Sequence, residues 1–186
     1  AQTTLQIAGL SSGSSFPVGV TTNTFRVTDA SGNTATCSFT VTVTDNQLPT
    51  ITCPANITVN NTPGQCSATV TYTTPAGADN CPSQVTTQTA GQPSGSVFPV
   101  GTTANTYRVV DASGNSASCS FNVTVNDVQA PNAICQNITV QLNNLGNGST
   151  NTAAINNGSS DNCGVSTLAL NTTSFTCSNV GPNNVT

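Results

Sequence analysis

The sequence predicts an all-β protein built from tandem immunoglobulin-like β-sandwich domains in an elongated array, and two observations predict it. The first is internal repetition, because residues 16–45 return as residues 98–127 at an offset of 82. A period this long indicates repeated domains, since each unit is large enough to bury a core of its own. The second is the alternation of apolar and polar residues in short runs that turn residues separate, which is typical of β-strands.

The central repeat gives this strand pattern in order. Alternating runs occupy residues 66–72 (CSATVTY), 106–111 and 119–125 (CSFNVTV), and such alternation places the apolar side chains on one face of a strand. Turn residues lie between the runs, at 60–64, 75–80, 92–95 and 111–115. No segment has a helical period. Roughly seven short strands in about 80 residues, with a turn every 8–12 residues, predict an immunoglobulin-like sandwich.

The repeat offset also divides the chain into three predicted parts. Residues 1–46 form the C-terminal part of one domain, residues 47–128 form a complete domain, and residues 129–186 form the N-terminal part of a third. The junctions at 45–49 and 127–131 are short and each ends in proline. We therefore expect stiff connections between neighbouring domains.

Composition argues against several classes of function. The net charge is −4 with only two basic residues, so the chain lacks the basic surface that nucleic acid requires. No run approaches the roughly 18 apolar residues of a membrane span. His and Lys are absent and the Ser and Asp residues are isolated, so we expect no enzyme activity and no catalytic residues. The absence of His and of a CxxC pair also argues against zinc.

Several motifs resemble a known family. These motifs are CPANITV (53–59), the GQCSA and DNC cysteine motifs, FPVG (98–101) and YRVVDASGNSASCSFNVTV (107–125). They resemble the hyalin repeat, or HYR domain, and residues 16–45 look like the second half of another such domain. The segment after residue 129 resembles the related tandem repeats of large surface adhesins of gliding bacteria. The resemblance implies an immunoglobulin-like fold, secretion, and an adhesive or scaffolding role at the cell surface without enzyme activity.

We therefore expect a non-enzymatic, structural or adhesive segment of an extracellular repeat protein, such as the stalk or fibre of an adhesin. Its expected partners are neighbouring copies or repeats of the same protein, with surface glycans as a second candidate. Two alternatives stay open at this point. One is a filament-forming extracellular subunit completed by neighbouring copies, and the other is a carbohydrate-binding module of a secreted enzyme.

The eight cysteines indicate an oxidising compartment and structural disulfides. The third part of the chain keeps the cysteine of the DNC motif as Cys163, but it lacks the GQC cysteine and has Cys177 instead. If this relocated cysteine keeps the DNC partner, the predicted bridges are Cys53–Cys119, Cys66–Cys81 and Cys163–Cys177. Cys37 and Cys135 are then expected to have no partner within their own incomplete repeats.

Oxygen ligands and glycan acceptors complete the candidate sites. Calcium is a candidate cofactor, because aspartates recur at the junctions and turns; the candidate ligands are Asp45, Asp127, Asp79 and Asp111. The alternative is that these aspartates cap their own turns. Asn-x-Ser/Thr sequons make eight asparagines possible glycosylation sites: Asn56, Asn60, Asn122, Asn137, Asn147, Asn157, Asn171 and Asn184.

Overall fold

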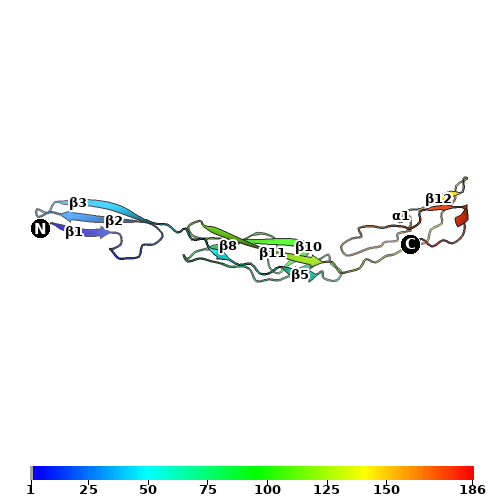
Figure 1. Ribbon diagram of the computed structural model, residues 1–186, viewed down its shortest axis with the longest axis horizontal. Helices are drawn as coiled ribbons and strands as arrows, with labels where there is room; N and C mark the ends of the chain where they lie inside the picture. Colours follow the sequence, from blue (N-terminus) through cyan, green and yellow to red (C-terminus); the bar gives the residue numbers. More distant parts are fainter. Residues whose placement is uncertain (1) are drawn as a thin grey trace. The chain divides into compact units, whose positions relative to one another are not determined.

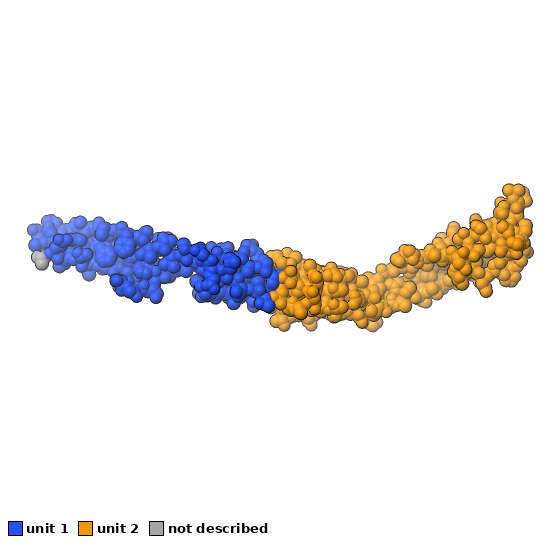
Figure 2. Space-filling view, in the orientation of Figure 1, with its two compact units in different colours: residues 1–52, 75–87, 107–119 blue, residues 53–74, 88–106, 120–186 orange. Residues whose placement is uncertain are grey.

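The computed structural model describes residues 2–186, and it divides the chain into two compact units that Figure 2 colours blue and orange. Unit 1 holds residues 1–52, 75–87 and 107–119, and unit 2 holds residues 53–74, 88–106 and 120–186. Three strands contribute residues to both units: β8 (Val85–Ala90), β10 (Gly101–Val110) and β11 (Ser116–Asn126).

Unit 1 begins with a three-stranded antiparallel sheet in the order β1-β2-β3 (Figure 1). Its strands are β1 (Thr3–Ala8), β2 (Gly19–Thr28) and β3 (Thr34–Val43). Asp29 makes the turn between β2 and β3, because its Oδ1 accepts hydrogen bonds from the backbone N–H groups of Ser31 at 2.9 Å and Asn33 at 2.8 Å. A second, two-stranded sheet pairs β4 (Thr50–Ile51) with β7 (Gly77–Ala78).

The strands β5 (Ile57–Asn60), β6 (Ser67–Val70) and β9 (Ser96–Pro99) lie in unit 2. A four-stranded sheet has the order β5-β11-β10-β8, and β6 pairs with β9 in a separate antiparallel sheet. Strand β5 pairs with β11 in parallel, with Ile57 opposite Val123. Strand β5, near the start of the central repeat, thus lies beside β11, the last strand of that repeat.

The buried apolar side chains of residues 2–186 all belong to the central repeat: Ala68, Val70, Phe98, Tyr107, Val109, Phe121, Val123 and Val125. Phe121 is 3 % exposed and meets the ring of Tyr72 edge-on, with 4.9 Å between the ring centroids. Its equivalent one period earlier, Phe39, is 51 % exposed. The difference follows from the number of strands, because residues 2–43 form three strands and have no counterpart of the β6–β9 pair.

Residues 129–186 form a sparser arrangement within unit 2. Strand β12 (Asn147–Ser149) pairs with β13 (Ser174–Thr176), and isolated bridges join Asn132 to Ser160 and Cys135 to Asn156. A single helical turn, α1 (Thr152–Ile155), begins at Asn151, whose side chain accepts a hydrogen bond from Ala154 N. A 3₁₀ turn, η1 (Cys177–Asn179), follows β13.

The structure confirms the predicted fold class, since nearly all of its regular elements are strands. The alternating runs at 66–72, 106–111 and 119–125 correspond to β6, β10 and β11. The helical turn α1 was not predicted, because four residues are too few to produce a helical period. Within residues 2–186, no helix has the length and apolar character needed to cross a membrane.

Candidate functional site

The first candidate site lies where the first repeat joins the second, and it brings together Asp45, Asp79 and Cys81. The carboxylate oxygens and the sulfur of these residues lie within 4.8 Å of one another. Asp45 follows β3 and accepts a hydrogen bond from Gln47 N at 3.0 Å, while Asp79 follows β7 and accepts one from Cys81 N at 2.9 Å. Both aspartates therefore shape their own turns and also converge on the thiol.

The surroundings of Cys81 make its thiol a weaker acid than that of an ordinary cysteine. A hydrogen bond with Asp45 raises the pKa of the Cys81 thiol, and so do partial burial and the charges of Asp45, Asp79 and Asp111. Each of these causes disfavours the thiolate. Because thiol–disulfide exchange requires a thiolate, both as attacking group and as leaving group, this environment slows exchange at Cys81.

The loop 111–115 closes one side of this cluster. Asp111 is buried, and its carboxylate accepts hydrogen bonds from Ser113 N, Asn115 N and Asn115 Nδ2 at 2.8–2.9 Å. Asn115 Nδ2 also donates to the backbone oxygen of Asp45 at 3.1 Å, which ties the loop to the junction. Burial pushes the pKa of Asp111 upward, but these hydrogen bonds outweigh it and hold the pKa below its ordinary value. The ionised form therefore stabilises the fold above the unfolded pKa, and this contribution is lost as the pH falls through the folded pKa.

A second cluster repeats the first one period later, with Asp127, Asp161 and Cys163 in the same arrangement. Asp161 Oδ1 accepts a hydrogen bond from Cys163 N at 2.8 Å, as Asp79 does from Cys81 N. The sulfur atoms differ in state, however. Cys163 forms a disulfide with Cys66, across a Cα–Cα distance of 4.8 Å and a sequence separation of 97 residues, whereas Cys81 is a free thiol.

The turn that carries Cys66, residues 60–66, is held at this second cluster by hydrogen bonds as well as by the disulfide. Asn61 Nδ2 donates to Asp127 Oδ1 at 3.0 Å, and Asn61 Oδ1 accepts from Val128 N at 3.2 Å. Gly64 N donates to Gln129 Oε1 at 2.8 Å. Asn162 Nδ2 donates to the backbone oxygen of Gln65 at 2.8 Å. We call this turn, residues 60–66, the GQC turn.

Two of the predicted disulfides are wrong. Cys66 bonds to Cys163 and not to Cys81, and Cys177 is an exposed free thiol. The physical reason is that the GQC turn holds Cys66 at the second cluster, whereas Cys81 belongs to the first. Cys37 and Cys135 are also free thiols, while Cys53 and Cys119 are both disulfide-bonded. The pairing of Cys53 with Cys119 stays a prediction.

A signal in the sequence could have revealed the Cys66–Cys163 bond. The position one period after Cys66 is Gly148, so the third part of the chain keeps a DNC cysteine without a GQC cysteine of its own. A DNC cysteine that bonds to the GQC cysteine of the repeat before it needs no such partner. The roles of Gln129 and Asn162 left no comparable signal, because Gln and Asn are abundant in this chain.

The two clusters supply few ligands for calcium. Asp45 Oδ2, Asp79 Oδ1 and Asp161 Oδ2 are buried without a nitrogen or oxygen donor, so some carboxylate oxygens could face a cation. Calcium, however, takes six to eight oxygen ligands, and each cluster offers two carboxylates beside a sulfur atom. Asp111 makes its own turn, in agreement with the alternative interpretation. Calcium binding stays a prediction.

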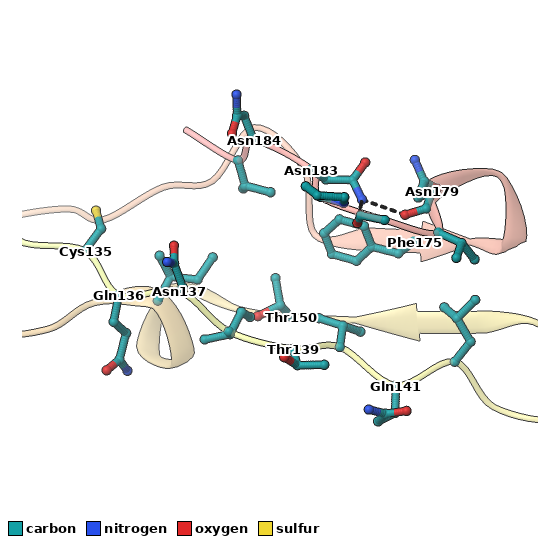
Figure 3. Close-up of a pocket in the computed structure, with 18 of the residues that line it drawn as sticks. Cys135, Gln136, Asn137, Thr139, Gln141, Thr150, Phe175, Asn179, Asn183 and Asn184 are labelled. Carbon is teal, nitrogen blue, oxygen red and sulfur yellow. Dashed lines mark hydrogen bonds between the residues drawn. The ribbon is translucent and has the colours of Figure 1, made fainter.

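An open cavity of about 1030 Å³ lies in the C-terminal segment, between residues 135–142 and 175–186. Figure 3 shows Thr139 and Gln141 on one side of it and Phe175, Asn179 and Asn183 on the other. Asn183 Nδ2 donates to Asn179 O at 2.6 Å and to Gly181 O at 3.0 Å, which holds the latter side together. None of the side chains that line the cavity is charged.

All eight candidate glycosylation asparagines are exposed, so a transferase could reach each of them in the folded chain. The Oδ1 atoms of Asn56 and Asn171 accept backbone hydrogen bonds, from Asn122 N at 2.8 Å and Thr186 N at 3.1 Å. Glycosylation itself stays a prediction.

Comparison with known proteins places the chain in a family. The model of the HYR domain matches residues 1–43 and 44–125. Hyalin of Strongylocentrotus purpuratus is 38 % identical over 149 residues, which is 74 % of this chain and 12 % of the relative, and hyalin of Lytechinus variegatus is 39 % identical over 62 % of this chain and 22 % of the relative. The sushi, von Willebrand factor type A, EGF and pentraxin domain-containing protein 1 of Rattus norvegicus is 39 % identical over 47 % of this chain and 2 % of the relative. The chain thus spans less than a quarter of the length of these relatives. Because the family model matches two repeats that together cover most of the chain, the protein belongs to the HYR domain family.

Proposed function

We propose that this chain is a non-enzymatic structural and adhesive segment of an extracellular repeat protein. Its membership of the HYR domain family supports an adhesion-type repeat. The disulfides support an oxidising compartment outside the cytosol. The proposed partners are neighbouring copies or repeats of the same protein.

The observation that carries this proposal is the Cys66–Cys163 bond. It joins the repeat matched at 44–125 to the segment that follows it, so adjacent parts of the chain are tied covalently and not only through a short linker. Closing a loop of about 100 residues stabilises a fold by roughly 4–5 kcal/mol in the chain-entropy description. A covalent tie between repeats suits a protein that transmits tension or holds surfaces together.

Exposed side chains favour contact with other copies. Leu5, Ile7, Val20 and Phe39 of the three-stranded sheet are each between 46 % and 67 % exposed. Leu5 and Val20 lie on one face of this sheet and Phe39 on the other, because Leu5 pairs with Arg26 and Phe39 pairs with Asn23. Each face therefore offers apolar area for contact with another copy. The low charge of the chain also leaves little electrostatic repulsion between copies.

Adhesion can be tested directly with coated beads. Beads that carry the oxidised chain should cluster with one another, and beads that carry reduced and alkylated chain should cluster far less, because the fold is then weakened. A Phe39→Ser variant should reduce clustering if the exposed sheet makes the contact, while Phe175→Ser serves as a control outside that sheet. Beads that neither cluster nor adhere to glycan-coated surfaces would contradict the proposal.

The same experiment separates the alternative of a carbohydrate-binding module. The uncharged cavity is lined by amide and hydroxyl groups together with apolar side chains such as Phe175. It favours that alternative, because amide and hydroxyl groups form hydrogen bonds with sugars and an aromatic ring can pack against them. Retention of beads on a polysaccharide surface without clustering, lost in the Phe175→Ser variant, would support the module instead of the adhesive repeat.

A further inference from the structure

Four residues of the second junction recur at the first. Asp127, Gln129, Asn162 and Cys163 bind the GQC turn. One period earlier the chain has the same residue types at Asp45, Gln47, Asn80 and Cys81. The clusters share their local geometry as well, since each brings two aspartates and a cysteine sulfur within 4.8 Å.

At the first junction three of these groups, Cys81, Asn80 and Gln47, are available to bind a similar turn. Cys81 is a free thiol of intermediate exposure, and the side chains of Asn80 and Gln47 are exposed. At the second junction Asn162 is partly buried because it donates to the turn. The two sites therefore differ in occupancy and not in the residues that form them.

We propose that Cys81 is the attachment point for the GQC turn of another HYR repeat, whose cysteine lies 97 residues earlier in the full-length protein. The turn is recognised by the same contacts as at the second junction. Asn80 donates to the backbone oxygen before the incoming cysteine, Gln47 accepts from the backbone N–H of the turn glycine, and Asp45 accepts from the turn asparagine. Each repeat is then bonded to the next through its GQC cysteine and to the previous one through its DNC cysteine.

The bond forms by a balanced oxidation. The two thiols lose two protons and two electrons to a small-molecule disulfide such as oxidised glutathione, which leaves as two molecules of reduced glutathione. The inference does not depend on the adhesive role proposed above, because disulfides and not adhesion are measured.

A tandem chain supplies the missing partner at the right distance. Residues 1–128 followed directly by residues 47–186 insert one extra repeat, which places Cys66 of the first copy 97 residues before Cys81 of the second. After refolding in a glutathione buffer, we expect the tandem to contain the same number of free thiols as the parent chain, which has four. Two additional free thiols in a folded tandem would overturn the proposal.

Variants of the second copy identify the bond. Cys81→Ser there should add one free thiol to the tandem, because the partner Cys66 of the first copy is released. Cys177→Ser should remove one, because that residue is already free. In Asn80→Ala of the second copy, the new bond should be reduced at a lower dithiothreitol concentration, because a contact with the turn is lost. Asn162→Ala removes the equivalent contact at the existing bond and serves as the matched variant.

Protein isolated from its natural source provides a second measurement that does not require the tandem to fold. After alkylation without reduction, Cys81 should be unmodified and linked to a peptide that contains a Gln-Cys pair from outside residues 1–186. Alkylation of Cys81 in that sample, or its linkage to a cysteine within these residues, would refute the proposal.

Discussion

Cys81 and Cys163 show how one residue type can occupy equivalent positions in two chemical states. Each follows an aspartate that accepts its backbone N–H, and each faces a second aspartate from the junction. Cys163 is bonded to Cys66, whereas Cys81 is a free thiol whose pKa is raised by a hydrogen bond with Asp45 and by the neighbouring carboxylates. Because equivalent aspartates face both sulfur atoms, they explain the raised pKa of the Cys81 thiol and not the difference in oxidation state.

Replacing Asp45 should make Cys81 more reactive. In Asp45→Asn the negative charge that raises the pKa of Cys81 is lost, and the new amide N–H can donate to a thiolate. The pH at which the alkylation rate of Cys81 rises should therefore be lower. Below the pKa, each unit of decrease raises the thiolate fraction about tenfold. The rate of iodoacetamide labelling at Cys81, followed by mass spectrometry across pH, measures this effect.

Asp127→Asn is the matched control for this experiment, because Asp127 belongs to the cluster of Cys163 and not to that of Cys81. It should leave the pH profile of Cys81 unchanged. An Asp45→Asn profile that coincides with that of the parent chain would show that Asp45 does not control the thiol.

At the scale of elements, a buried asparagine on β10 holds β8 and the turn that leads to β9 in place by hydrogen bonds. Asn105 on β10 is fully buried, and its Oδ1 accepts hydrogen bonds from Gln92 N at 2.9 Å and Gln88 Nε2 at 3.3 Å. In the first repeat, Asn23 Oδ1 accepts the equivalent hydrogen bonds, from Leu10 N at 2.9 Å and from Gln6 Nε2 at 3.2 Å. The recurrence indicates that this buried polar contact is part of the fold of the repeat.

Gly91 should not tolerate a side chain beside Asn105. Its φ is +88°, and a Cβ there would meet the Asn105 amide. Gly91→Ala should therefore cost about 1–2 kcal/mol for the left-handed backbone and about 1–3 kcal/mol more for overpacking. Gly95→Ala is the control, because its φ of +85° is similar but nothing lies within 4 Å of the added Cβ. Hydrogen exchange of the Gln92 amide reports the difference, and equal protection in the two variants would argue against the packing contact.

Strands and turns of the central repeat could be predicted from the sequence because their signals are local. The alternation at 119–125 reflects which side chains of β11 face the core, and Asp111 makes the turn that its motif indicates. The disulfide of Cys66 could not be predicted this way. Its partner depends on which residues the GQC turn meets in three dimensions, namely Gln129 and Asn162, and periodicity carries no such information.

At the scale of the whole molecule, equivalent sequences have different environments. Phe121 is buried while Phe39, one period earlier, is half exposed and stacks on Phe25 with 6.1 Å between the ring centroids. The apolar alternation is the same in both repeats, so local pattern sets which face is apolar and the neighbouring strands decide whether that face is covered. The oxidation states of Cys81 and Cys163 follow the same logic, because the GQC turn is bonded to Cys163 and not to Cys81.

The Cys66–Cys163 bond should limit how far the chain extends under force. When the oxidised chain is pulled by its two ends, the loop of 97 residues between these cysteines cannot lengthen, so reduction should add about 320–350 Å of contour length at 3.3–3.6 Å per residue. Single-molecule force spectroscopy with and without reductant measures this difference. In Cys163→Ser the contour length gained on reduction should be smaller, because the loop is no longer closed in the oxidised chain. In Cys177→Ser this gain should be unchanged, because Cys177 is a free thiol. An equal decrease of this gain in both variants would show that Cys163 and Cys177 are bonded to each other. Tension would then pass through the folded segment between Cys66 and Cys163 instead of through the sulfur atoms of these two residues.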